Sequence, residues 1–163
     1  MKKQDHLPMY GVGPLYVAVI AALTLAGALF SWTKALSSGN CSVLAVPMAV
    51  LGVLLMMLGV VLWVHAILID KVDAGILQNK LVTGGVYAWT RNPIYAAFLF
   101  LFTGILLIMH NMWLLLLPVF FWALLTLLMK HTEEKWLRKQ YGAEYDAYCR
   151  RVNRCIPWFP HNV

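Results

Sequence analysis

Charged residues are scarce in this chain. Asp, Glu, Lys and Arg make up 12% of its 163 residues, whereas 61% of the residues are hydrophobic. A soluble domain carries about 25% charged residues and is about half apolar. The scarcity of charge therefore excludes an ordinary soluble domain and indicates an integral membrane protein.

Cysteine is also scarce. The three cysteines are Cys41, Cys149 and Cys155. Their spacing matches no zinc-binding motif, and an odd number of cysteines cannot all form disulfides. We expect all three to be structural, and we predict no metal site.

Acidic residues are rarer than basic ones. The chain has seven Asp and Glu and 13 Lys and Arg, which gives a net charge of +6. In a soluble protein this excess would suggest nucleic acid as a partner. Here the basic residues lie outside the apolar stretches, so orientation in the membrane and contact with anionic lipid explain them more simply. We expect membrane lipid, and no nucleic acid, as a partner.

Long apolar runs are abundant, and four of them predict membrane-spanning helices: Leu15–Leu36, Val43–Ile69, Ile94–Met109 and Met112–Met129. The hydrocarbon core requires about 20 apolar residues in a helix, and the first two runs reach this length. The last two runs are shorter, and only His110 and Asn111 separate them, so we expect a tight antiparallel hairpin. The predicted fold class is all-α integral membrane, with about four transmembrane helices and a C-terminal amphipathic helical segment.

Basic residues fall on one side of this topology. They precede the first span, occur between the second and third spans, and are dense after the fourth, whereas the His110–Asn111 turn has no formal charge. Basic flanks mark the cytoplasmic side of a membrane protein. We expect a multi-pass protein whose termini and active site are cytoplasmic. Residues 1–163 then form one membrane domain, with two N-terminal spans in residues 15–69.

The tail after the fourth span is amphipathic. Leu137, Tyr141, Tyr145 and Tyr148 recur at helical spacing. Taken alone, this pattern is typical of an interfacial helix lying on the lipid headgroups.

A glycine-containing and aromatic cluster precedes the third span, over residues 79–95. Gly84 and Gly85 permit a tight turn or the close approach of a ligand. Arg91 offers a planar guanidinium that matches a carboxylate. Pro93 suits the first turn of a helix, whose free backbone N–H groups favour an anion. A juxtamembrane loop with aromatic anchors remains the alternative interpretation.

Two adjacent carboxylates, Glu133 and Glu134, follow the fourth span. Adjacent helical residues point about 100° apart, so the two carboxylates need not share one site. A buried carboxylate requires a partner, and Arg91 or a bound ammonium group would serve. The alternative is a solvated pair that balances Lys130 and Lys135. Together, the two clusters suit a ligand that contains an amino acid moiety and a purine.

These clusters belong to an ordered pattern in the last half of the chain, between about Asn79 and Pro157. It consists of Leu81-Val82-Thr83, Gly85-Val86-Tyr87, Arg91-Asn92-Pro93-Ile94-Tyr95, Glu133-Glu134, Tyr141-Gly142, Glu144-Tyr145, Tyr148, Arg151-Val152 and Ile156-Pro157. The pattern resembles the isoprenylcysteine carboxyl methyltransferase family and the related phospholipid methyltransferases of membranes.

The resemblance implies that S-adenosylmethionine is the cofactor and binds in a cytoplasmic pocket, in a catalytic core over residues 79–157. The implied cofactor-binding residues are Asn79, Lys80, Leu81, Val82, Tyr87, Asn92, Pro93, Ile94, Tyr95 and Glu133. Arg91 and Glu134 are the implied catalytic residues. A lipophilic methyl acceptor would enter from the bilayer near Met129 and Lys130.

Two positions depart from the family pattern. The family has His where this chain has Asn92, and Asn cannot titrate. The arginine that eukaryotic members place near the end of the fourth-span helix corresponds to about Met129, beside Lys130. The acceptor therefore stays open among an isoprenylcysteine-type carboxylate, a lipid headgroup and a thiol.

Three other functions compete with a methyltransferase. Membrane sterol reductases share a similar C-terminal pattern and use NADPH, but they are usually much longer. A non-enzymatic membrane protein on the same scaffold is a second alternative. A transporter would be expected to carry ionisable residues within its spans, and only His65 qualifies.

Overall fold

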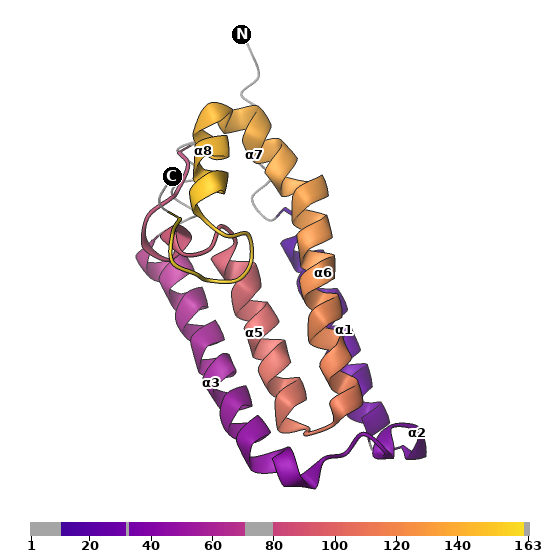
Figure 1. Cartoon of the computed structure of the whole chain (residues 1–163). Helices are drawn as coiled ribbons and strands as arrows, with labels where there is room; N and C mark the ends of the chain where they lie inside the picture. Colours follow the sequence, from indigo (N-terminus) through magenta and orange to yellow (C-terminus); the bar gives the residue numbers. More distant parts are fainter. Residues whose placement is uncertain (1–10, 32, 71–79, 162–163) are drawn as a thin grey trace.

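Four long helices lie side by side, and the first helix of the chain packs beside the third and the fourth rather than beside the second (Figure 1). They are α1 (Gly13–Ser31), α3 (Ala45–Val64), α5 (Pro93–Ile108) and α6 (Leu116–His131). The shorter helices are α2 (Lys34–Ser37), η1 (Ser42–Leu44), η2 (His65–Ile69), η3 (Gly85–Ala88), η4 (Met112–Leu115), α7 (Glu133–Tyr141) and α8 (Ala143–Arg151). This computed structural model describes residues 11–31, 33–70 and 80–161, and the predicted cofactor residue Asn79 lies outside them.

The all-α membrane architecture predicted from the sequence is confirmed. Three helical stretches are long and apolar enough to cross a membrane: Gly13–Ser31, Ser42–Ile69 and Met112–Tyr141. The predicted third span is the shorter apolar helix Pro93–Ile108. At the predicted hairpin turn, the buried Asn111 side chain donates to the backbone oxygen of Leu36 and to Asn40 Oδ1, which ties the turn to the first loop.

The structure corrects the expected bounds of the first span and divides the tail. The first span ends at Ser31 rather than Leu36, because Thr33 is extended and the chain restarts as the separate helix α2. The C-terminal amphipathic segment is two helices, α7 and α8. Gly142 separates them with a φ of +53°, a conformation that glycine adopts without strain.

The helices α3 and α5 approach each other closely through glycines. A Cβ atom on Gly52 would lie 2.6 Å from the backbone oxygen of Gly104, and one on Gly59 would lie 2.6 Å from that of Ala97. Small residues permit such close helix packing within lipid, where the hydrophobic effect does not drive one helix against another.

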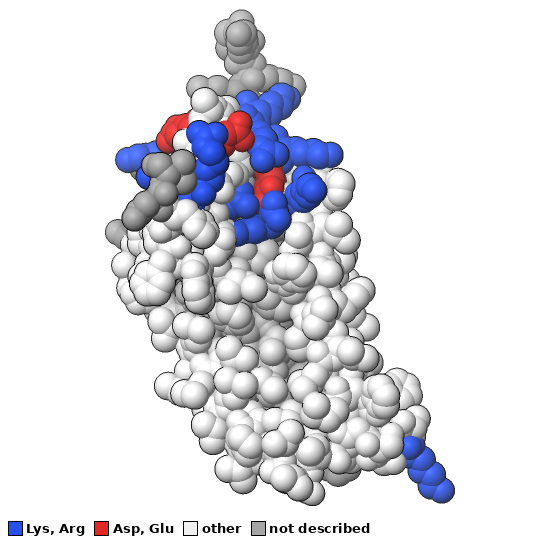
Figure 2. Space-filling model, in the orientation of Figure 1, with Lys and Arg blue, Asp and Glu red and all other residues white. Residues whose placement is uncertain are grey.

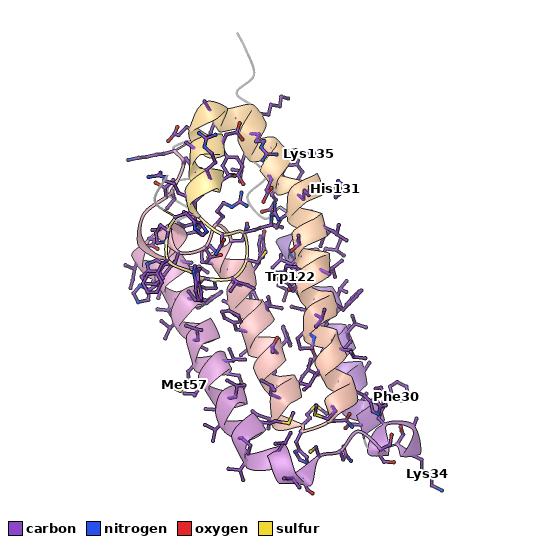
Figure 3. The ribbon with its side chains drawn as sticks, viewed as in Figure 1. Phe30, Lys34, Met57, Trp122, His131 and Lys135 are labelled. Atoms are coloured by element: carbon purple, nitrogen blue, oxygen red, sulfur yellow. The ribbon has the colours of Figure 1, made fainter. Side chains whose placement is uncertain are left out.

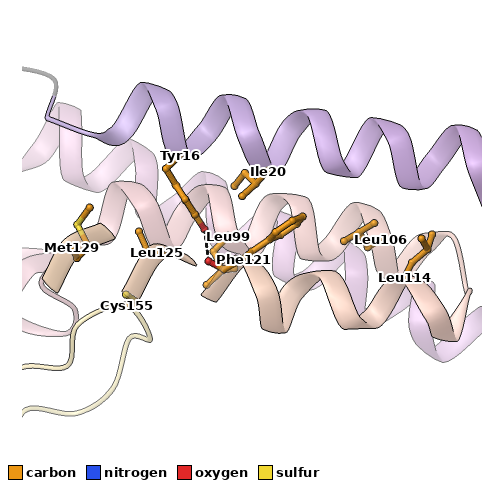
Figure 4. Packing of buried hydrophobic residues seen from close by; sticks show 9 residues of the cluster. All are labelled: Tyr16, Ile20, Leu99, Leu106, Leu114, Phe121, Leu125, Met129 and Cys155. Atoms are coloured by element: carbon orange, nitrogen blue, oxygen red, sulfur yellow. Dashed lines mark hydrogen bonds between the residues drawn. The ribbon is translucent and has the colours of Figure 1, made fainter. Parts of the chain in front are cut away.

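A second apolar core joins α1, α5 and α6 (Figure 4). Tyr16 and Ile20 from α1 pack with Phe121 and Leu125 from α6, and the Tyr16 hydroxyl donates to the Phe121 backbone oxygen at 3.4 Å. Outside this core, large apolar side chains point away from the bundle, as Figure 3 shows for residues such as Met57. An apolar outer surface is the one that a bilayer requires.

Charge gathers at one end of the bundle. Figure 2 shows the Lys, Arg, Asp and Glu residues at the end where α7 and α8 lie, with a single basic side chain at the opposite end. That side chain is Lys34, labelled in Figure 3. This distribution matches the one-sided charge of the predicted topology. The assignment of the charged end to the cytoplasm stays a prediction.

Candidate functional site

The charged end holds a cavity of about 560 Å³. Its walls come from the beginning of α1, the end of α3 with η2, the first turns of α5, the helices α7 and α8, and the segment that precedes α5. The volume lies within the usual range for small-molecule sites, about 300–1,000 Å³.

The predicted cofactor residues within the described part of the chain all line this cavity. They are Lys80, Leu81, Val82, Tyr87, Asn92, Pro93, Ile94, Tyr95 and Glu133, and the predicted catalytic Arg91 joins them. Tyr141, Tyr145 and Tyr148 also line it. These three tyrosines therefore face the protein interior, and the amphipathic tail covers the cavity.

Three other predicted residues lie outside the cavity lining. Glu134 is buried behind Arg91. Met129 is fully buried in the core cluster that also contains Cys155. Lys130 is exposed on α6. The structure therefore does not bring the two residues predicted for the acceptor to the cavity.

Glu133 connects three elements at the cavity wall. Its Oε1 atom accepts a hydrogen bond of 2.6 Å from the Tyr95 hydroxyl of α5 and one of 3.0 Å from the backbone N–H of Val12, just before α1. These bonds hold the α7 carboxylate against the starts of two long helices. Glu133 also lines the cavity.

Arg91 and Glu134 form a buried ion pair. Arg91 Nη2 lies 3.3 Å from Glu134 Oε1, and the two side chains are 8% and 3% exposed. Arg154 donates to both oxygens of the same carboxylate. Glu134 thus pairs with two arginines. One of them is Arg91, which the sequence analysis named as a possible partner for a buried carboxylate.

One nitrogen atom of the Arg91 guanidinium has no hydrogen-bond partner among the described residues. This atom is the buried Nε, whereas Nη1 donates to the Cys149 sulfur. A buried polar group without a partner is costly, and such a group at a cavity wall can be satisfied by a ligand that accepts hydrogen bonds.

The segment before α5 is fastened to the C-terminal segment. The Asn92 side chain donates to the Arg154 backbone oxygen at 2.8 Å, and the Arg91 backbone N–H donates to the Asn153 oxygen at 2.8 Å. On α8, the Tyr148 hydroxyl donates to the Tyr87 backbone oxygen at 2.6 Å. Burial raises the pKa of the Tyr148 phenol above its usual range, so this group keeps its proton at neutral pH.

Sequence reasoning missed the contribution of the first helix. Gly11, Gly13, Pro14 and Val17 line the cavity, although they lie far in sequence from the expected core. A Cβ atom on Gly13 would lie 2.5 Å from the Tyr95 ring, so glycine lets α1 begin against that side chain. The paired glycines before Pro14 are a weak sequence signal of this close approach.

The cavity residues fit a zwitterionic ligand with a flat ring. Glu133 presents a carboxylate suited to a cation, and the buried Arg91 Nε offers a donor suited to an anion. The surrounding tyrosines and Trp136 provide aromatic surface for a ring system or a positive charge.

Comparison with known proteins identifies a family. A family model described as phospholipid methyltransferase matches residues 48–144, which is more than half of the chain. No curated protein and no solved structure matches the chain. The matched stretch runs from α3 to the first residues of α8, and it includes the cavity residues on α5 and α7.

Proposed function

The chain belongs to the phospholipid methyltransferase family and is a membrane methyltransferase, and from this premise we propose that it transfers a methyl group from S-adenosylmethionine to a lipophilic acceptor. The observation that carries the proposal is the cavity that brings Glu133, Arg91 and the tyrosines of α8 together at the charged end of the bundle.

The proposed donor site assigns a role to each kind of cavity residue. Glu133 would hold the positively charged part of the donor, and the unpartnered Nε of Arg91 would donate to its carboxylate. Tyrosines such as Tyr145 would pack against the purine. When bound, the donor would supply a methyl group on a positively charged sulfur; the methyl–sulfur bond would break as the acceptor's nucleophile bonds to the methyl carbon, and the donor would leave as a neutral thioether.

The protein's part in this reaction is positioning. Fixed placement of the two reactants is worth several kcal/mol of the barrier, about 7–11 in favourable cases. Here α7 and α8 form part of the cavity wall, and the exclusion of water by these helices would protect the bound donor. We assign Glu134 as a positioning residue, because it contacts Arg91 and Arg154 and does not line the cavity. No residue is assigned as a general base.

The proposed catalytic core is wider than residues 79–157. It includes the beginning of α1 and the end of α3 with η2, because both line the cavity. The charged end would lie in the cytoplasm, where the basic residues of α7 and α8 meet anionic headgroups.

The proposal is tested by methyl transfer from S-adenosylmethionine labelled in its methyl group. The purified protein is reconstituted into vesicles of phosphatidylethanolamine and phosphatidylglycerol, and label in the lipid fraction is measured. An isoprenylcysteine compound and a lipophilic thiol are offered in parallel. We expect label in one acceptor class, with Arg91→Ala at least a hundredfold slower than the native chain. Arg150→Ala, on the exposed face of α8, is the matched control and keeps native activity.

Two outcomes would contradict the proposal. One is the absence of label in every acceptor class from protein that is folded by thermal unfolding. The other is equal activity of Arg91→Ala and Arg150→Ala, which would separate the cavity from the reaction.

A further inference from the structure

The segment that follows α8 runs back beside the segment that precedes α5. Figure 1 shows it as the yellow loop at the start of α5. The Arg91 backbone N–H donates to the Asn153 oxygen at 2.8 Å, and the Trp158 N–H donates to the Trp89 oxygen at 3.0 Å. We call residues 153–158 the C-terminal strap, because they fasten these two segments together.

The backbone oxygen of Arg154, within the strap, fixes both neighbours of Arg91. It accepts a hydrogen bond of 2.8 Å from the Asn92 side chain and one of 3.2 Å from the Thr90 hydroxyl. Thr90 is fully buried, and its backbone pairs with that of Asn153 as an isolated parallel bridge. The backbone on each side of Arg91 is therefore tied to the strap.

The side chain of Arg154 holds the carboxylate that pairs with Arg91. Its Nε atom donates to Glu134 Oε1, and its Nη2 atom donates to Glu134 Oε2 at 3.2 Å. A two-point contact between a guanidinium and a carboxylate fixes their relative orientation. Arg91 Nη2 lies 3.3 Å from the same Oε1 atom. Arg154 thus acts on the surroundings of Arg91 twice, through its carbonyl and through its guanidinium.

The strap is anchored in the apolar core on its other side. Cys155 is 2% exposed and belongs to the core cluster that contains Leu125 and Met129 of α6 (Figure 4). Arg154 lines a second hollow, beside Trp122 of α6, and does not line the cavity of the proposed donor site. An influence of Arg154 on a bound donor would therefore pass through the residues that it contacts.

These contacts leave one guanidinium nitrogen of Arg91 for a ligand. Arg91 lines the cavity, and its buried Nε atom has no hydrogen-bond partner among the described residues. We propose that Arg154 is a positioning residue of the donor site, which holds Arg91 so that this Nε is offered to the carboxylate of the donor. The inference rests on the proposed function. It adds that the strap gives the site its preference for a donor that carries a carboxylate.

Calorimetry with two ligands tests the role of Arg154. The ligands are S-adenosylmethionine and its decarboxylated form, which keeps the sulfonium, the amine and the purine. We expect the native chain to bind S-adenosylmethionine at least tenfold more tightly than the decarboxylated form. Arg154→Ala should weaken the binding of S-adenosylmethionine at least tenfold and leave the affinity for the decarboxylated form unchanged. Arg150→Ala, at an exposed position of α8, is the matched control and should keep both affinities.

Two results of this titration would overturn the proposal. One is an equal loss of affinity for both ligands in Arg154→Ala, which a merely structural role would produce. The other is an unchanged affinity for S-adenosylmethionine in that variant. Only an effect that passes through the carboxylate contact of Arg91 changes the preference between the two ligands.

Thr90→Val repeats the test without the removal of a charge. It keeps the shape of a buried side chain and removes one of the two side-chain donors to the Arg154 oxygen. We expect it to weaken S-adenosylmethionine binding at least threefold and to leave the decarboxylated form unaffected. Thr33→Val, at an exposed position just before α2, is its control. If Arg154→Ala does not fold, Thr90→Val decides alone, and an equal loss for both ligands contradicts the proposal.

Hydrogen exchange of the unliganded proteins separates this inference from the function on which it rests, because exchange reports local opening of the backbone. The Arg91 amide is bonded to a strap oxygen, so we expect it to exchange at least tenfold faster in Arg154→Ala than in the native chain or in Arg150→Ala. If the native chain binds neither ligand, the proposed function fails, and the exchange rates still decide whether Arg154 holds Arg91. If the native chain binds both ligands equally well, the inference fails and the function stands.

Discussion

Glu134 is the carboxylate that holds the buried charges of the site in balance. It is 2% exposed and pairs with Arg91 and Arg154. The hydrogen bond from Arg154 to the Glu134 carboxylate is the main cause that raises the pKa of Arg154. Since both arginines stay charged, the removal of this one carboxylate leaves two positive groups without compensation.

We therefore expect Glu134→Gln to lower the free energy of unfolding by about 3 kcal/mol, because breaking a buried ion pair from one side costs about 3–5 kcal/mol. Thermal unfolding in mild detergent measures the effect. Glu144→Gln removes an exposed carboxylate from α8 and should change stability by less than about 0.5 kcal/mol. Equal stability of the two variants would show that the buried pair does not contribute as described.

Tyr95 orients the other carboxylate. Its hydroxyl donates to Glu133 at 2.6 Å, and hydrogen bonds to charged groups are worth about 1.5–3 kcal/mol. We expect Tyr95→Phe to bind S-adenosylmethionine about tenfold more weakly in calorimetry, because Glu133 loses its fixed position while the aromatic ring stays. Unchanged affinity would mean that Glu133 is positioned by Val12 alone or does not contact the donor.

At the scale of elements, the beginning of α1 fits against α5 only because Gly13 has no side chain. A Cβ atom there would lie 2.5 Å from the Tyr95 ring. We expect Gly13→Ala to displace Tyr95 and to weaken donor binding at least tenfold, as measured by calorimetry. Gly84 has no atom within 4 Å of its added Cβ, so Gly84→Ala is the control that should bind normally. If both variants bind like the native chain, the start of α1 is not part of the site.

The elements themselves were largely predictable from the sequence. Apolar runs such as Val43–Ile69 have a single physical interpretation in a chain so poor in charge, and the structure places helices there. The break at Gly142 was harder to predict, because Tyr141, Tyr145 and Tyr148 keep helical spacing across it. The spacing of the tyrosines does not reveal that the backbone of Gly142, between them, has a positive φ angle.

The placement of the site residues was only partly predictable. Glu133 and Glu134 are adjacent and chemically alike, so their residue type and spacing did not decide which one faces the cavity and which one pairs with Arg91, and only the family resemblance assigned Glu133 to the cofactor. The contribution of residues 11–17 was missed because none of them is Asp, Glu, Lys, Arg or His. Their role comes from long-range packing of α1 against α5, which local patterns do not encode.

For the whole molecule, the one-sided charge predicts orientation. Lys34 is the single described basic residue at the end opposite α7 and α8 (Figure 2). In a chain whose three cysteines are changed to alanine, we expect Ala35→Cys to react with a membrane-impermeant maleimide added outside intact cells, and Glu144→Cys to react only after lysis. Both positions are exposed. The reverse labelling pattern would place the cavity outside the cytoplasm.

Binding of S-adenosylmethionine to the purified protein, titrated calorimetrically in mild detergent with NADPH in parallel, tests the central claim most directly. We expect saturable binding of S-adenosylmethionine at one site. Glu133→Ala and Arg91→Ala should each weaken it at least tenfold, and Glu144→Ala should leave it unchanged. A ligand that binds only the folded protein should also raise its melting temperature. Absence of S-adenosylmethionine binding at millimolar concentration by folded protein would contradict the proposed donor site, and binding of NADPH in its place would favour a reductase.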